Sequence, residues 1–192
     1  MWYLKIKTKL YHLAVSVCLI ITSLAPIDAQ ASLSALSSAR LKSLDDDTRV
    51  RLNAAMRDMR RRGIRPRVNS TFRSQAEQRA LYRCSHNRRC RARRGIYGAK
   101  RPGTSMHEAG LAVDIGGVAK GGRRRRLTSR GRKVVQIMRK HGFKWRYGMR
   151  DPVHFELSPQ TAGYRTEKAA IKAGQQRWLA NNRARRRARR QA

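Results

Sequence analysis

Two histidines and two aspartates stand in apolar or strand-like segments, where a titratable side chain needs a partner. His107 and Asp114 lie seven positions apart, and Asp151 precedes His154 by three positions. An ionised carboxylate buried alone is strongly destabilising, so Asp114 in its apolar run requires a cation nearby. Either an arginine of this arginine-rich chain or a metal ion would meet that requirement.

Taken together, these residues match the donor set of a catalytic zinc site. Such a site takes three protein ligands of the histidine and carboxylate type and leaves a fourth position for water. His107, Asp114 and His154 are the three predicted ligands of one zinc ion, which leaves Asp151 as the predicted general base. Glu156, two positions after His154, either orients an imidazole or is a surface strand residue.

The spacing of these residues resembles a known family. The motifs S-x-H-x-x-G-x-A-x-D at 105–114 and D-x-x-H-F-E at 151–156 are similar to those of the M15 zinc D-alanyl-D-alanine carboxypeptidases and L-alanyl-D-glutamate endopeptidases. The similarity extends upstream to the stretch 71–74 with Gln78, Leu81 and Tyr82, and covers about residues 67–157. It implies an α+β, DD-peptidase/hedgehog-like metallopeptidase domain that hydrolyses peptidoglycan stem peptides.

The resemblance also implies roles for individual residues. It assigns zinc binding to the three ligands named above and proton transfer to Asp151. It further implies that Arg73 contacts the substrate or the transition state, and that Ser105 and Gln78 bind substrate. Vancomycin-resistance-type carboxypeptidases usually carry glutamate where Asp151 stands, so this position looks more like the endopeptidase branch.

The elements that must position these residues follow from periodicity and capping signals. Helices are predicted over 45–62, 74–82 and 128–141, and strands over 67–71, 110–115, 143–147 and 153–157. Ser74 and Glu77 form a capping box. His107 is expected on a loop, and long basic loops are expected over 84–102 and 121–126. This order predicts an α+β fold with a small, mostly antiparallel sheet flanked by helices.

The ends of the chain differ in composition from its middle. Residues 1–31 show basic, apolar and small-residue regions in the order of a secretory signal peptide, so the protein is expected to be exported, periplasmic or secreted. A retained membrane anchor is the alternative, although the apolar run is shorter than a bilayer span. The predicted organisation continues with a linker at 32–44, the peptidase domain at 45–160 and a basic helix or tail at 161–192, whose last ten residues are expected to fray.

Two cysteines remain once Cys18 leaves with the signal segment. Cys84 and Cys90 are an even pair in an oxidising compartment and predict a short-loop disulfide. The alternative is a zinc pair, but no second pair with finger spacing follows, and His86 alone does not complete four ligands.

The net charge of +35 requires an anionic partner. Arginine clusters at 88–94, 123–126 and 183–190 lie outside any apolar period, as expected for a solvated surface. An exported protein meets anionic cell-envelope polymers before nucleic acid, so an envelope polymer is the expected partner beside the peptide substrate. The alternative function is a non-catalytic module that binds wall polyanion, lipopolysaccharide or nucleic acid, and a membrane-disrupting tail is a third hypothesis.

Overall fold

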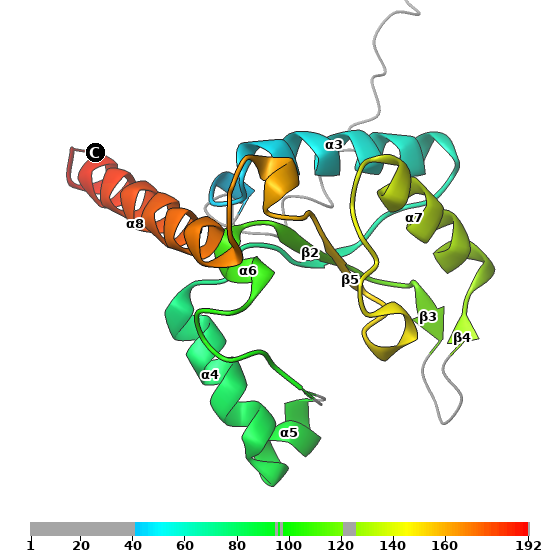
Figure 1. The fold of residues 1–192 in the computed structure, drawn as a ribbon, viewed down its shortest axis with the longest axis horizontal. Helices are drawn as coiled ribbons and strands as arrows, with labels where there is room; N and C mark the ends of the chain where they lie inside the picture. Colours follow the sequence, from blue (N-terminus) through cyan, green and yellow to red (C-terminus); the bar gives the residue numbers. More distant parts are fainter. Residues whose placement is uncertain (1–40, 95, 97, 121–125, 192) are drawn as a thin grey trace, which may run out of the picture. The chain divides into compact units, whose positions relative to one another are not determined.

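The computed structural model describes residues 41–191 except 95, 97 and 121–125, and all of these belong to one compact unit, Ser32–Ala192 (Figure 1). The predicted signal peptide and most of the predicted linker lie outside the described residues. Among the described helices, none is both long and apolar enough to pass through a bilayer.

A three-stranded antiparallel sheet carries the candidate site. Its strands are β1 (Val68–Ser70), β2 (Ala112–Ile115) and β5 (His154–Glu156), in the order β1-β2-β5. Asp114 on β2 is paired with His154 on β5. Because directly opposed residues of an antiparallel pair point to the same face, the register alone places these two side chains together.

Two helices pack with the sheet to form the main core. Helix α3 (Asp46–Arg61) is capped by Asp45, whose side chain accepts a hydrogen bond from the Asp47 amide. Helix α7 (Ser129–Lys140) is capped by Thr128, whose hydroxyl accepts one from the Gly131 amide. Each cap satisfies an amide that has no partner within its helix. The buried faces of α3 and α7 join Val113, Ile115 and Phe155 of the sheet in one apolar cluster, which confirms the predicted α+β class.

Helix α4 (Gln75–His86) begins at the predicted capping box, in which Ser74 and Glu77 bond each other's amides. It continues four residues beyond the predicted end. The predicted loop at 84–102 is wrong in its first half, because helix α5 (Arg88–Arg94) follows directly. Arginine is a good helix former when its side chain reaches solvent, and α5 buries none of its residues.

One further prediction fails near the sheet. The predicted strand 143–147 makes only an isolated bridge, Lys144 to Glu156, after which the chain turns into a 3₁₀ helix (Gly148–Arg150). The Trp145 indole N–H donates to the Pro152 carbonyl, which holds that turn. Two short paired strands, β3 (Ala119–Lys120) and β4 (Arg126–Leu127), flank the predicted loop 121–126, of which residues 121–125 lie outside the described residues.

Two helices of very different length lie against each other on the second apolar cluster. Helix α6 (Met106–Ala109) carries His107, which the sequence placed on a loop, and helix α8 (Glu167–Gln191) follows the 3₁₀ turn Gln160–Ala162. Ala170 and Ile171 of α8 are buried with Met106 and Ala109 of α6. Helix α8 continues to Gln191, so the segment that was expected to fray is helical as far as this residue.

Candidate metal centre and cleft

Three side chains from two strands and a short helix converge on one point. The Oδ1 atom of Asp114 lies 3.2 Å from Nε2 of His107 and 3.3 Å from Nδ1 of His154. One ligand atom from each residue lies within 4.8 Å of the others. The chain thus brings together the three residues that the sequence singled out as zinc ligands.

The second ring nitrogen of His107 determines which atom faces the centre. Its Nδ1 lies 2.7 Å from the Thr71 carbonyl oxygen. A carbonyl only accepts, so Nδ1 carries the proton and donates it. The lone pair of Nε2 is then left pointing towards Asp114, as a metal ligand requires.

His154 is held in the same way by a carboxylate. Its Nε2 lies 2.9 Å from Oε2 of Glu156, while Nδ1 faces Asp114. Glu156 is buried, and its other oxygen accepts from Nη1 of Arg146 at 3.0 Å. The sequence left two interpretations of Glu156 open. The structure supports the one in which Glu156 orients an imidazole, and the burial of Glu156 rules out a surface strand residue.

The electrostatics of the centre favour a cation. Burial alone would raise the pKa of Asp114, but the adjacent His107 and His154 outweigh it and keep the pKa below its ordinary value. Burial alone would lower the pKa of His154, but its hydrogen bonds to Asp114 and Glu156 raise the pKa to about 9.

The donor set fits zinc. Two imidazole nitrogens and one carboxylate oxygen are the ligands of catalytic zinc sites, and both imidazoles have the outer hydrogen bond that such ligands usually make. Three protein donors leave a coordination position free for water or substrate. The three side chains would therefore hold one zinc ion with an open place.

A cleft of about 640 Å³ opens over this centre. Every predicted catalytic and substrate-binding residue lines it together with His107 and Asp114, namely Asp151, Arg73, Ser105 and Gln78. The structure thus places these residues around one space, although their roles remain predictions.

Arg73 is fixed at the wall of the cleft. Its guanidinium donates to Gln78 Oε1 at 2.8 Å and to Ser70 Oγ at 3.2 Å, and its backbone N–H donates to the His107 carbonyl at 3.0 Å. Gln78 is buried and donates in turn to the Lys100 carbonyl at 2.6 Å. Gln78 therefore connects Arg73 to the backbone at Lys100, another residue that lines the cleft.

Asp151 is exposed and follows the 3₁₀ turn directly. Its backbone carbonyl accepts from the His154 N–H at 3.2 Å, which closes a tight turn around Pro152. The three-residue spacing seen in the sequence is thus the spacing of one turn. The turn keeps Asp151, the predicted base, close to strand β5, which carries the metal ligand His154.

The sequence did not assign a role to Glu108, which the structure buries completely. Its carboxylate accepts from the Gly103 amide at 2.9 Å and from the Ser105 amide at 3.3 Å, so it holds the loop that leads into α6. Burial raises the pKa of Glu108 against these hydrogen bonds. A serine followed three positions later by glutamate is a helix-start signal, and it was available in the sequence.

The structure places Tyr147 in the wall of the cleft. Its ring lies 5.2 Å from the ring of His154, and Lys100 Nζ lies 5.6 Å above its face. The buried hydroxyl has no hydrogen-bond partner among the described residues. Lys100 and Arg150, neither of which the sequence singled out, add positive charge to the cleft beside Arg73.

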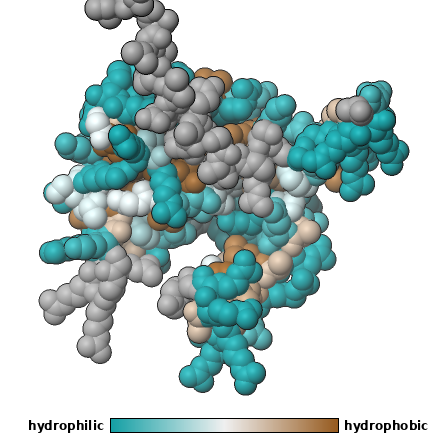
Figure 2. All heavy atoms as spheres, turned by 180° about the vertical axis from the view of Figure 1, so that it is seen from behind, coloured by the Kyte–Doolittle hydropathy of each residue, from teal (hydrophilic) through white to brown (hydrophobic). Residues whose placement is uncertain are grey.

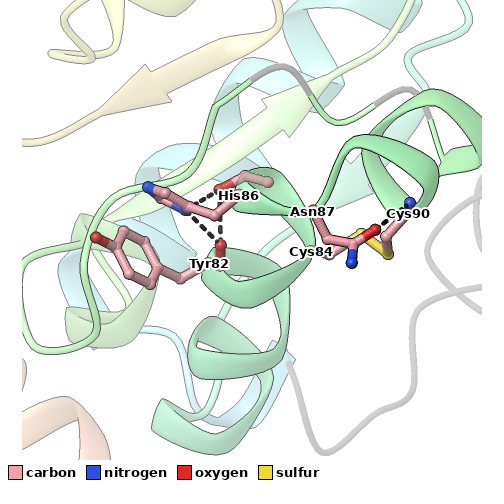
Figure 3. The surroundings of a disulfide bond; sticks show 6 residues. Tyr82, Cys84, His86, Asn87 and Cys90 are labelled. Carbon is pink, nitrogen blue, oxygen red and sulfur yellow. Dashed lines mark hydrogen bonds between the residues drawn. A yellow bond between two sulfur atoms is a disulfide. The ribbon is translucent and has the colours of Figure 1, made fainter.

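The predicted disulfide is present between Cys84 and Cys90 (Figure 3). It joins the last turn of α4 to α5, where Asn87 Oδ1 accepts from the Cys90 amide at 2.9 Å. His86 bonds the Tyr82 carbonyl at 2.8 Å beside it. The bridge lies within the segment that runs from Gln78 on α4 to Lys100 at the cleft.

An antiparallel sheet that carries a His–Asp–His centre under an open cleft is typical of a metallopeptidase. The family model of VanY, D-alanyl-D-alanine carboxypeptidase, matches residues 41–168. The chain therefore belongs to the VanY family of D-alanyl-D-alanine carboxypeptidases. This membership confirms the predicted M15-type zinc peptidase class.

One solved structure similar to the chain is that of a mutant of the vancomycin resistance D,D-pentapeptidase VanY from a VanB-type resistance cassette, in complex with Zn(II). The identity is 22% and the TM-score 0.41, over 71% of this chain and 83% of that chain. No curated protein matches the chain significantly.

Proposed function

We propose that the protein is a zinc-dependent D-alanyl-D-alanine carboxypeptidase that trims stem peptides of peptidoglycan. The observation that carries this proposal is the convergence of His107, Asp114 and His154 on one point that opens into the cleft. Family membership supplies the reaction class, and the centre supplies the means to perform it.

Zinc bound by these three residues would polarise the scissile carbonyl and make a water molecule acidic enough to lose a proton near neutral pH. Asp151 takes the proton of the attacking water on its carboxylate and passes it to the departing amine. His107 and His154 keep their lone pairs aimed at the centre because Thr71 and Glu156 hold the opposite nitrogens.

Arg73 is proposed to bind the negative charge of the substrate. A guanidinium binds a carboxylate or a developing oxyanion through strong, directed hydrogen bonds. Lys100 and Arg150 line the same cleft, so a peptide that ends in a free carboxylate meets three cations there. This charge supports cleavage at the end of a peptide, as in a carboxypeptidase.

A second candidate is an L-alanyl-D-glutamate endopeptidase. Asp151 favours it, because the resemblance associates aspartate at this position with the endopeptidase branch. Mass spectrometry of peptidoglycan fragments digested by the zinc-loaded protein distinguishes the two. Loss of a terminal D-alanine supports the carboxypeptidase, a new N-terminal D-glutamate supports the endopeptidase, and no cleavage contradicts both.

We also propose that the protein is exported and that its charge holds it on an anionic envelope polymer. All six arginines of the stretch 183–190 are exposed on α8, and the surface of that helix in Figure 2 is largely hydrophilic. So many like charges within two helical turns repel each other, so an anionic polymer would stabilise this segment. Binding of such a polymer without peptide cleavage would favour the non-catalytic module instead.

A further inference from the structure

Helix α8 lies beyond the end of the family match for most of its length, yet it packs on the helix that carries His107. The match ends at residue 168, whereas α8 spans Glu167–Gln191. Gly174 of α8 faces the end of α6, where a Cβ atom would lie only 2.4 Å from the Glu108 carbonyl oxygen. Only glycine permits this approach, so the two helices meet almost backbone to backbone.

The close approach satisfies carbonyls that α6 cannot satisfy itself. In a helix of only four residues, no carbonyl can accept a hydrogen bond from an amide of the same helix. The Met106 and His107 carbonyls accept from the amides of Leu111, Gly110 and Arg73. The remaining two accept from side chains of α8, since Gln175 donates to Glu108 at 3.1 Å and Arg177 donates to Ala109 at 2.7 Å.

Gln175 also reaches the turn that carries Arg73. Its Nε2 donates to the Arg73 carbonyl at 3.3 Å, and its Oε1 accepts from the Gln75 amide, the first of α4, at 3.1 Å. One side-chain amide thus bonds three backbone groups from two separate segments. Those segments hold Arg73 on one side and His107 on the other.

The neighbouring residue Trp178 fixes the same face of α8. Its ring stacks on Phe72 with a centroid separation of 5.3 Å, and Phe72 is fully buried next to Arg73. The stacking contact limits sliding of α8 along the turn that carries Phe72 and Arg73. It keeps the amide of Gln175 in reach of both carbonyls.

We infer that Gln175 is a positioning residue of the peptidase site, and that α8 is part of the catalytic scaffold as well as a carrier of charge. The inference rests on the proposed function for the roles of Arg73 and His107. Gln175 sets the distance between the cationic wall of the cleft and one ligand of the metal centre. A small displacement of such a group weakens both metal binding and catalysis.

The test replaces Gln175 with methionine, which keeps length and apolar volume but removes all three hydrogen bonds. The matched control is Gln176→Met, one position further on the exposed face of α8. Two quantities are measured on the full chain: zinc affinity by competition with a chelator, and kcat/KM at saturating zinc on a soluble pentapeptide that ends in D-Ala-D-Ala. Both are repeated in an Arg73→Lys background.

The expected result for Gln175→Met is zinc affinity lower by about tenfold and kcat/KM lower by about tenfold, with a near-normal unfolding temperature. The loss in kcat/KM should shrink in the Arg73→Lys background, because Arg73 is then no longer in place to be displaced. Values equal to those of Gln176→Met, or losses that simply add to those of Arg73→Lys, would overturn the inference. A wild-type chain that binds zinc but cleaves nothing would instead remove the proposed function, and the zinc affinities would still decide the role of Gln175.

Discussion

Glu156 and His154 face each other two positions apart on one strand, with Oε2 2.9 Å from Nε2. The period of two along a strand puts both side chains on the same face. On the far side of the imidazole, Nδ1 points to Asp114. The hydrogen bond to Glu156 fixes the rotation of the His154 ring. Other rotations of the ring would turn Nδ1 away from the metal centre.

Replacing Glu156 with glutamine tests that arrangement. The amide keeps the shape but loses the charge that makes the imidazole a better ligand, so zinc affinity should fall by about 10- to 100-fold. Competition with a chelator measures it. The control is Glu167→Gln, because Glu167 also pairs with Arg146 but is half exposed and lies on α8 rather than on the strand of His154. Equal affinities in the two variants would contradict the role of Glu156.

Asp151→Asn separates metal binding from proton transfer. Zinc content should stay at the wild-type level, because Asp151 is not among the three converging ligands, while kcat should fall by about 10²- to 10⁴-fold. Metal analysis and turnover on the soluble pentapeptide provide the two readouts. His107→Ala is the opposite case and should lose zinc first. Turnover by Asp151→Asn at the wild-type rate would show that another group carries the proton.

The Asp58 carboxylate predicts a change of stability with pH. It is buried at the end of α3, and hydrogen bonds from His141, Arg61 and Lys140 hold its pKa well below the ordinary value. A lowered pKa contributes stability that is present above the unfolded pKa of about 3.9 and is lost as pH falls through the folded value. Wild-type protein should therefore be more stable than Asp58→Asn at pH 7. The difference should shrink below about pH 4 in urea titrations, and a difference that grows there would refute the assignment.

The disulfide predicts a local gain in stability. Cross-linking so short a loop removes unfolded-state entropy worth roughly 2 kcal/mol. The double variant Cys84→Ser with Cys90→Ser should have a free energy of unfolding lower by that amount, measured by urea titration. A reductant should shift the unfolding midpoint of the wild type towards that of the variant. The same reductant should leave the double variant unchanged. A wild-type chain that is insensitive to reductant would show that the bridge does not stabilise the fold.

Deleting residues 183–192 separates the charged end of α8 from the part that contacts α6. Gln175, Arg177 and Trp178 remain in the shortened chain, so turnover of the soluble pentapeptide should stay within about twofold of wild type. Binding to an anionic wall polymer should weaken and lose most of its salt dependence, as measured by sedimentation at several salt concentrations. Unchanged polymer binding would place the anionic contact elsewhere on the surface.

The local parts of the site could be read from the sequence because short-range rules determine them. The capping box at Ser74, the single turn between Asp151 and His154, and the alternation that puts Glu156 beside His154 all follow from neighbours in the chain. The donor types indicated the three ligands, the order of the predicted elements indicated the α+β class, and the resemblance to a known family agreed with both. The same local rules failed at 143–147 and in the first half of 84–102, where a turn and a helix replaced the predicted strand and loop.

The tertiary structure decided everything that depends on segments far apart in the chain. The 3.2 Å approach of His107 to Asp114 requires α6 to pack beside β2, and the hydrogen bond from Gln175 to Arg73 spans 102 positions. No periodicity within either segment encodes such a contact, because it arises only when the apolar faces of separate elements are buried together. The sequence by itself determined which groups were available for chemistry, whereas packing determined which of them share one cleft.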